Sequence, residues 1–125
     1  MSQLSGKILK TRDFAIKGSD VYINKCDGKP GMLLIHAKWC HHCVKFISTF
    51  NEIADTIGKD FCCASIESEQ LNDKLSNVLK IQGFPTIKFF DQKGKIIGEY
   101  NKERNKQTIL TEICKVYHHC ISKRF

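Results

Sequence analysis

The sequence predicts an α/β fold with a mixed central sheet of four or five strands, flanked by helices on both faces. Two continuous apolar runs, residues 32–37 and 61–66, are typical of strands buried on both sides. A segment with helical spacing of apolar residues follows each run, and two strand patterns around a turn come later in the chain. Strands separated by helices and followed by a hairpin indicate this mixed, two-sided architecture.

Before the first long strand, the chain carries two short β-type segments, residues 14–16 and 21–23. The loop over residues 24–31 follows them, and its Asp-Gly and Pro-Gly pairs are strong turn signals. The buried strand over residues 32–37 then leads into the first helix. Right-handed connections place the turn at residues 39–43 beyond the carboxyl end of a central strand.

The first helix is expected to run from Cys43 to about Gly58. Its apolar residues recur at three- and four-residue steps, which is the spacing of one buried helix face. Gly58 stands where a helix C-cap glycine is expected. The apolar stripe consists of Phe46, Ile47, Phe50, Ile53, Ala54 and Ile57.

The second half of the chain is expected to hold a helix, a hairpin and a last helix. The first of these helices is predicted over residues 69–81, and strands over residues 86–90 and 95–100 flank a turn at residues 91–94. The last helix covers about residues 106–122. The apolar faces of the two helices are formed by Leu71, Leu75, Val78 and Leu79, and by Ile109, Leu110, Ile113, Val116, Tyr117, Cys120 and Ile121.

Length and composition are typical of one domain with a packed core. The 125 residues are 42% hydrophobic and include eight Phe. We therefore expect a single domain over residues 1–125, with a core at about residues 20–121 and an N-terminal extension at residues 1–19. A monomer is expected.

The formal charge of +7 indicates a basic surface rather than a nucleic-acid site, because the 20 basic residues are spread beside 13 acidic ones without a basic run. No apolar run is long enough to span a bilayer, and the N-terminus lacks the apolar stretch of a secretory signal. We expect no membrane or nucleic-acid partner. The expected location is intracellular by default, or inside a particle if the source is a large virus. In a reducing compartment, framework disulfides among the seven Cys are not expected.

Cys40 and Cys43, separated by two residues at the predicted start of a helix, form the candidate redox centre. That spacing lets the two thiols close a small disulfide without rearranging the backbone. The helix macrodipole and free backbone N–H groups stabilise a thiolate at the first position. Cys43, one turn deeper, can then attack a mixed disulfide between Cys40 and a client. The outer thiol therefore attacks and the inner one resolves.

Two motifs carry a resemblance to a known family. The segment AKWCHHC at residues 37–43 resembles the active-site motif of thioredoxins and protein disulfide isomerases, and GFPTIKFF at residues 83–90 resembles their cis-proline loop and the following strand. The similarity extends from about residue 20 to 121 and is closest to the isomerase-like domains. It implies a thioredoxin-like fold and a thiol–disulfide oxidoreductase that acts on protein disulfides. Its redox group would be the Cys40–Cys43 disulfide, with no bound cofactor.

The resemblance also implies a client-binding surface beside the thiols. The Phe84–Pro85 peptide is expected to be cis and to pack against Cys40 and Cys43. Backbone groups near Pro85 are expected to pair with an extended client segment, as in strand addition. Trp39 is expected to flank the site as an aromatic surface for clients.

The two residues between the cysteines, His41 and His42, are candidates for tuning the redox couple, together with the adjacent Trp39. Typical thioredoxins have Gly-Pro there and isomerases have Gly-His, so His42 matches the isomerase pattern and His41 matches neither. An imidazolium beside Cys40 stabilises the thiolate and hence the reduced protein. We therefore expect a couple more oxidising than the roughly −270 mV of a reductant thioredoxin.

Two positions depart from the family pattern. The family usually places a buried acidic residue six positions before the first Cys, and isomerases add a partner Lys on the neighbouring strand. Here these positions hold Leu34 and, at about the Lys position, Ser65. Proton transfer from Cys43 is left to His36, His42 or water, and our hypothesis is that His42 contributes.

The other cysteines are assigned by their expected surroundings. At least one of Cys62 and Cys63 is expected to be a small core residue on a buried strand. Cys26, in a loop, is the candidate exposed thiol for intermolecular linkage. Cys114 and Cys120 belong to the last predicted helix, with Cys120 on its apolar face.

Three functional hypotheses remain open. The first is an oxidoreductase on protein disulfides, either isomerase- or oxidase-like or a general reductant, with a reductase, thiol oxidase or glutathione as redox partner. The second is a redox-inactive module that keeps the fold for client capture or as a particle component. The third is a zinc-dependent interaction domain, because residues 40–43 and 118–120 carry Cys and His. No second pair at structural-zinc spacing follows, so no metal is expected.

Overall fold

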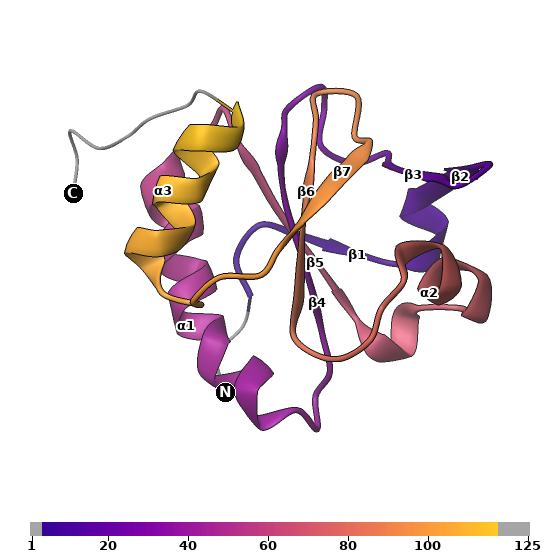
Figure 1. Cartoon of the computed structure of the whole chain (residues 1–125), viewed down its shortest axis with the longest axis horizontal. Coiled ribbons are helices and arrows are strands. Elements are labelled where there is room, and N and C mark those ends of the chain that lie inside the picture. Colours follow the sequence, from indigo (N-terminus) through magenta and orange to yellow (C-terminus); the bar gives the residue numbers. More distant parts are fainter. Residues whose placement is uncertain (1–3, 118–125) are drawn as a thin grey trace.

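The computed structural model describes residues 4–117, and its centre is a five-stranded mixed sheet (Figure 1). The strand order is β1 (Lys7–Leu9), β5 (Cys62–Glu67), β4 (Gly31–His36), β6 (Thr86–Phe90) and β7 (Ile96–Tyr100). The first three strands are parallel to one another, whereas β6 is antiparallel to both β4 and β7. The predicted α/β class and mixed sheet are confirmed.

Each face of the sheet is covered, as Figure 1 shows. Helices α1 (His41–Ile57) and α3 (Lys106–Tyr117) pack on one face. The other face carries α2 (Asp73–Leu79) and a separate two-stranded hairpin of β2 (Phe14–Lys17) and β3 (Asp20–Ile23). None of the helices within residues 4–117 is long and apolar enough to cross a bilayer.

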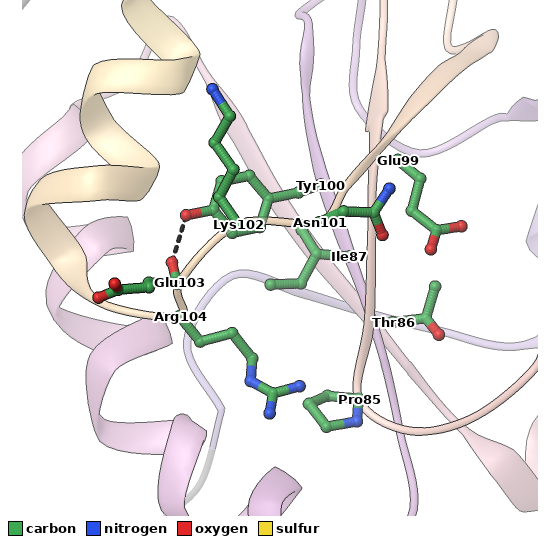
Figure 2. Close-up of a pocket in the computed structure, with 9 residues that line it drawn as sticks. All are labelled: Pro85, Thr86, Ile87, Glu99, Tyr100, Asn101, Lys102, Glu103 and Arg104. Atoms are coloured by element: carbon green, nitrogen blue, oxygen red, sulfur yellow. Dashed lines mark hydrogen bonds between the residues drawn. The ribbon is translucent and has the colours of Figure 1, made fainter.

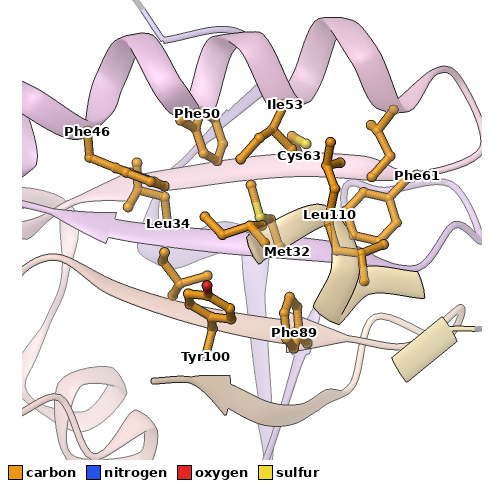
Figure 3. Packing of buried hydrophobic residues seen from close by; sticks show 14 residues of the cluster. Met32, Leu34, Phe46, Phe50, Ile53, Phe61, Cys63, Phe89, Tyr100 and Leu110 are labelled. Carbon is orange, nitrogen blue, oxygen red and sulfur yellow. The ribbon is translucent and has the colours of Figure 1, made fainter. Parts of the chain in front are cut away.

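The central strand β4 supplies side chains to the cores on both faces. Met32 and Leu34 join the cluster beneath α1 and α3, and Leu33 and Ile35 join the cluster on the opposite face. This alternation follows from the period of two along a strand, and it explains the continuous apolar run in the sequence. Figure 3 shows the first cluster, in which the α1 side chains lie over β4 and β5.

The buried face of helix α1 consists of residues that the sequence predicts to be buried. Phe46, Phe50, Ile53 and Ile57 are all buried against the sheet. Gly58 ends the helix with a φ of 87°, in the left-handed region that favours glycine. The helix begins directly after Cys40, so the core packing of α1 also fixes the position of the two thiols.

Helix α2 is shorter than the predicted segment 69–81. A 3-10 turn (Ser68–Gln70) precedes it, and the Asn72 side chain accepts a hydrogen bond from the Leu75 backbone N–H at 2.8 Å. An Asn that caps the backbone in this way begins a new helix rather than continuing one. At the other end, Lys80 adopts a left-handed conformation with a φ of 56° and ends the helix.

The N-terminal segment contributes a strand that the sequence pattern does not reveal. Strand β1 pairs in parallel with β5 at the edge of the sheet, and β2 also lies within the residues assigned to an extension. The three residues of β1 are too few for a periodic pattern, and Ile8 is exposed. Gly6 lets the chain just before β1 lie close to β5, because a Cβ at this position would be only 2.1 Å from the Cys63 carbonyl oxygen.

The prediction that Cys26 is an exposed thiol is wrong. Cys26 is 4% exposed and forms a disulfide with Cys62, with the two Cα atoms 5.8 Å apart. The expectation of no framework disulfide is therefore also wrong, because folding brings the loop after β3 against the start of β5. Cys63 points to the opposite face and is a free, buried core thiol, as predicted for one of the pair. Cys114, on α3, is also disulfide-bonded.

Removing the Cys26–Cys62 cross-link is expected to lower the free energy of unfolding by about 2–4 kcal/mol, because the unfolded chain gains conformational freedom. The double variant Cys26→Ala/Cys62→Ala should show this loss in urea unfolding under non-reducing conditions. Cys63→Ala is the control for a buried thiol without a cross-link. The wild-type protein is also unfolded after full reduction, in a buffer that keeps its thiols reduced. If its unfolding midpoint is then the same as before reduction, the disulfide assignment is contradicted.

The last helix is described as far as Tyr117. Ile109, Leu110 and Ile113 are buried as predicted, whereas Val116 is 38% exposed and is not part of the core. The predicted continuation of this helix, with Cys120 and Ile121 on its apolar face, lies outside the described residues.

Candidate functional site

The two thiols of the CxxC motif lie at the turn from β4 into α1. Cys40 is the N-cap residue of α1, and its Sγ accepts a hydrogen bond from the Cys43 backbone N–H at 3.2 Å. A sulfur that accepts a backbone N–H at a helix N-terminus is stabilised in its charged form. Cys40 is 6% exposed and Cys43 only 1%, so Cys40 is the outer thiol.

The loop before β6 contacts this pair, as the sequence predicts. The Phe84–Pro85 peptide is cis, and the Cys40 thiol donates to the Phe84 carbonyl oxygen at 3.5 Å. Phe84 also packs against the small cluster that Ala37 forms with the two cysteines. Two segments more than 40 residues apart in the chain therefore meet at one sulfur atom.

An exposed aromatic side chain stands beside the thiols. Trp39 is 76% exposed, and its ring meets the Phe84 ring edge-on, with 5.6 Å between the centroids. Val44, on the first turn of α1, is a second exposed apolar side chain. A large apolar group left in water next to a reactive atom is available for a partner.

Burial raises the pKa of the Cys43 thiol well above its usual value. The hydrogen bond with Cys40 raises this pKa further, whereas a backbone hydrogen bond from Ala37 and the positive charge of Arg104 lower it. Cys43 is therefore a protonated thiol at neutral pH.

Arg104 is a site residue that the sequence reasoning missed. Figure 2 shows its side chain reaching from the loop before α3 towards Pro85, and the two residues line one cavity of about 350 Å³. Arg104 also lines a smaller cavity of about 140 Å³ with His42 and Phe46. It thus lies between the cis-proline loop and α1. No local motif marks this position, because the contact depends on how the loop over residues 101–105 folds back.

Replacing Arg104 by Gln is expected to slow the attack of Cys43 at neutral pH by roughly three- to tenfold, the range of one partly screened charge. The lost positive charge raises the Cys43 pKa further, so the pH dependence of the second release should move to higher pH in this variant. A chromogenic aryl disulfide measures this step. Attack by Cys40 is expected to release one aryl thiolate, and attack by Cys43 on the resulting mixed disulfide is expected to release a second.

The matched control for this prediction is Lys102→Gln in the same loop. The Lys102 ammonium pairs with Glu112 at 2.8 Å and does not affect the Cys43 thiol. If Lys102→Gln slowed the second release as much as Arg104→Gln does, the specific role of Arg104 would be contradicted.

His41 and His42 are both exposed on the first turn of α1, with ring centroids 6.2 Å apart. His42 faces the cavity that it shares with Lys45 and Arg104. Both imidazoles are therefore open to solvent at the end of the helix that carries Cys40.

The two positions that depart from the family pattern lie side by side in the sheet. Leu34 on β4 and Ser65 on β5 are register partners, and both are fully buried. Within the described part of the chain, the Ser65 hydroxyl has no hydrogen-bond partner. Neither side chain can accept a proton as a carboxylate does.

The part of the chain that the structure describes contains no candidate metal-binding group. No three His, Cys, Asp or Glu side chains of residues 4–117 are grouped so that they could hold a metal ion. The candidate ligands His118, His119 and Cys120 lie outside the described residues.

The mixed sheet, the CxxC pair at the start of α1 and the cis-proline beside it together define a domain of the thioredoxin fold with a dithiol site. The family model for thioredoxin matches residues 17–115. The chain belongs to the thioredoxin family.

Curated relatives are named as disulfide isomerases. Protein disulfide isomerase-like 1-1 of Arabidopsis thaliana is 27% identical over 120 residues, which are 91% of this chain and 24% of that protein. Protein disulfide-isomerase of Zea mays is 34% identical over 84 residues, 64% of this chain and 16% of that protein. This chain therefore spans about a quarter or less of the length of these relatives.

Solved structures share the fold. The crystal structure of the Trx4 domain of ERdj5 superposes with a TM-score of 0.71 and 19% identity, over 90% of this chain and 96% of that one. This likeness concerns the backbone architecture, and it supports the strand order and the helix positions described above.

Proposed function

We propose that this domain is a thiol–disulfide oxidoreductase that acts on protein disulfides, with Cys40 as the nucleophile and Cys43 as the resolving thiol. The observation that carries the proposal is the backbone N–H of Cys43 donating to Cys40 Sγ at the start of α1. This contact gives the outer sulfur a backbone hydrogen-bond donor at the start of α1, next to an exposed aromatic surface. The disulfide isomerases among the relatives support the same class of reaction.

The proposed reduction of a client disulfide has two exchanges. The Cys40 thiolate attacks one client sulfur, so that a Cys40–client bond forms, the client S–S bond breaks and the first client thiolate leaves. Cys43 then loses its proton and attacks Cys40 Sγ, which forms the Cys40–Cys43 bond and releases the second client thiolate. The client gains two electrons and the domain loses two. Oxidation of a client dithiol is the same sequence in reverse.

The client is proposed to bind across the Trp39 and Phe84–Pro85 surface. The Trp39 ring offers exposed apolar area, and the Phe84 carbonyl and neighbouring backbone can pair with an extended segment. The adjacent cavity of about 350 Å³, lined by Pro85, Thr86 and Arg104, has room for a client side chain. Extended protein segments with an accessible disulfide or thiol are the proposed substrates.

The direction of electron flow is proposed to be isomerase- or oxidase-like. His41 and His42 stand exposed at the helix end that carries Cys40, where a positive imidazolium favours the thiolate and the reduced protein. Such a couple gives electrons less readily than a reductant thioredoxin does. The Cys40–Cys43 pair is the redox group, and a reductase, a thiol oxidase or glutathione is the proposed redox partner.

A redox-inactive client-binding module is the second candidate function, favoured by Leu34 in place of the usual buried acid. The deciding experiment compares reduction of insulin disulfides with reoxidation of a reduced, unfolded protein substrate in glutathione buffer. The proposed function predicts catalysis of both, with the oxidative reaction stronger relative to a thioredoxin standard. Substrate binding without catalysis in either assay would instead support the binding module.

A further inference from the structure

The proposed mechanism leaves the proton of Cys43 without an acceptor. The thiol is buried and protonated at neutral pH, so its attack on Cys40 needs a group that takes the proton. Leu34 cannot do so, and the neighbouring Ser65 hydroxyl is not basic at neutral pH.

Two titratable side chains share a cavity with Cys43, those of His36 and Lys38, and of the two only the imidazole offers an acceptor nitrogen. His36, the last residue of β4, and Cys43, on the first turn of α1, line the same cavity of about 410 Å³. Leu4, Val44 and Ile47 form most of the apolar wall. Since one water takes up about 30 Å³, the cavity has room for water between the imidazole and the thiol.

His36 lies on the correct face of the sheet for this role. Met32 and Leu34 point towards α1, and alternation along the strand gives His36 the same direction, one pleat nearer to the active-site turn. It therefore occupies the next available position on that face after Leu34. His36 is half-buried, and its register partner on β5 is Glu67.

Burial lowers the pKa of His36, and the negative charge of Glu67 opposes that shift without cancelling it. The imidazole is therefore neutral at pH 7 and free to accept a proton. The charged and titratable groups around it are Glu67 on β5, Lys38 in the following turn and Cys43 on α1.

We propose that His36 accepts the proton of Cys43 across the cavity that both residues line, in place of the buried acid that Leu34 replaces. This proposal rests on the proposed redox function of the CxxC pair. His42 is less well placed, because it is exposed and lines a different cavity together with Arg104.

The step is balanced in atoms and electrons. The Cys43 S–H bond breaks and its proton passes to a ring nitrogen of His36, directly or through one water. The Cys43 thiolate attacks Cys40 Sγ, the Cys40–client bond breaks, and the departing client thiolate takes a proton from the imidazolium or from solvent. The client sulfur is reduced and Cys43 is oxidised, so no other oxidant is needed.

The test follows the two releases of thiolate from the chromogenic aryl disulfide as a function of pH. In His36→Gln, the second release should be at least tenfold slower than in the wild-type protein near pH 7, because general-base assistance contributes roughly 10²–10⁴-fold where it is complete. The first release should stay within about twofold, because it depends on Cys40. The two proteins should converge at high pH, where hydroxide removes the proton. Ile47→Val is the control, because it alters the same cavity wall without removing a titratable group, and both releases should stay within about twofold of the wild-type rates.

A second variant keeps the proposal testable if His36→Gln misfolds. Glu67→Gln removes the charge that raises the His36 pKa, so the acidic limb of the second release should move to lower pH while the plateau stays the same. An unchanged second release in His36→Gln, or an unmoved limb in Glu67→Gln, would overturn the role of His36. Absence of any release from Cys40 in the wild-type protein would instead overturn the proposed redox function.

Discussion

Replacing Cys40 by Ser is expected to reduce disulfide exchange by more than about a thousandfold, since Cys40 is the outer thiol at the start of α1 and the proposed nucleophile. Replacing Cys43 by Ser has a different expected result. The variant should still attack a client through Cys40 but should keep it as a stable mixed disulfide. Turnover in the insulin assay should be lost in both variants, and only Cys43→Ser should accumulate a covalent client complex on a non-reducing gel.

The matched control is Cys63→Ala, which removes the other free thiol among residues 4–117. Burial raises the pKa of Cys63 to about 12, so this thiol is not ionised and takes no part in exchange. Turnover in Cys63→Ala should therefore stay close to that of the wild-type protein. Client complexes on Cys40→Ser, or loss of turnover in Cys63→Ala, would mean that the roles of the cysteines are assigned incorrectly.

Truncating Phe50 to Ala is expected to produce the largest loss of stability, about 3–5 kcal/mol. Phe50 lies at the middle of α1, has no exposed area and packs in the cluster between α1 and the sheet (Figure 3). Its ring also contacts Phe46 at a centroid distance of 6.4 Å. Urea unfolding followed by circular dichroism measures the loss.

Val44→Ala is the control for helix packing, because Val44 lies on the same helix but is 55% exposed. It should change the free energy of unfolding by no more than about 0.5 kcal/mol. Similar losses in the two variants would contradict the assignment of the buried face of α1. Because α1 carries both thiols, a destabilised Phe50→Ala protein should also lose activity at a lower temperature than the wild-type protein.

Most of the fold could be predicted from the sequence because its strongest signals are periodic. The run at residues 32–37 corresponds to β4, and the stripe from Phe46 to Ile57 corresponds to the buried face of α1. Where the signal depends on tertiary contacts, prediction failed. Strand β1 exists because Gly6 lets the chain approach β5, and three residues carry no periodicity. The start of α2 depends on the cap at Asn72 rather than on apolar spacing.

The candidate site also contains some residues that local sequence motifs reveal and others that only the folded structure reveals. Cys40, Cys43 and Phe84 belong to two local motifs that the sequence reveals, and the structure brings these three residues together. Arg104 and the Cys26–Cys62 disulfide depend on loops that fold back over long distances in the chain. His36 was only one of several candidates until the shared cavity distinguished it from His42.

The most direct test of the central claim is a redox titration of the full chain in glutathione buffers, read by differential alkylation and peptide mapping. We expect Cys40 and Cys43 to interconvert together as one two-electron couple, with a potential less negative than about −270 mV. Cys63 should stay reduced throughout the titration. Independent alkylation of Cys40 and Cys43, or the absence of a disulfide between them in every buffer, would show that the two thiols do not form a redox pair.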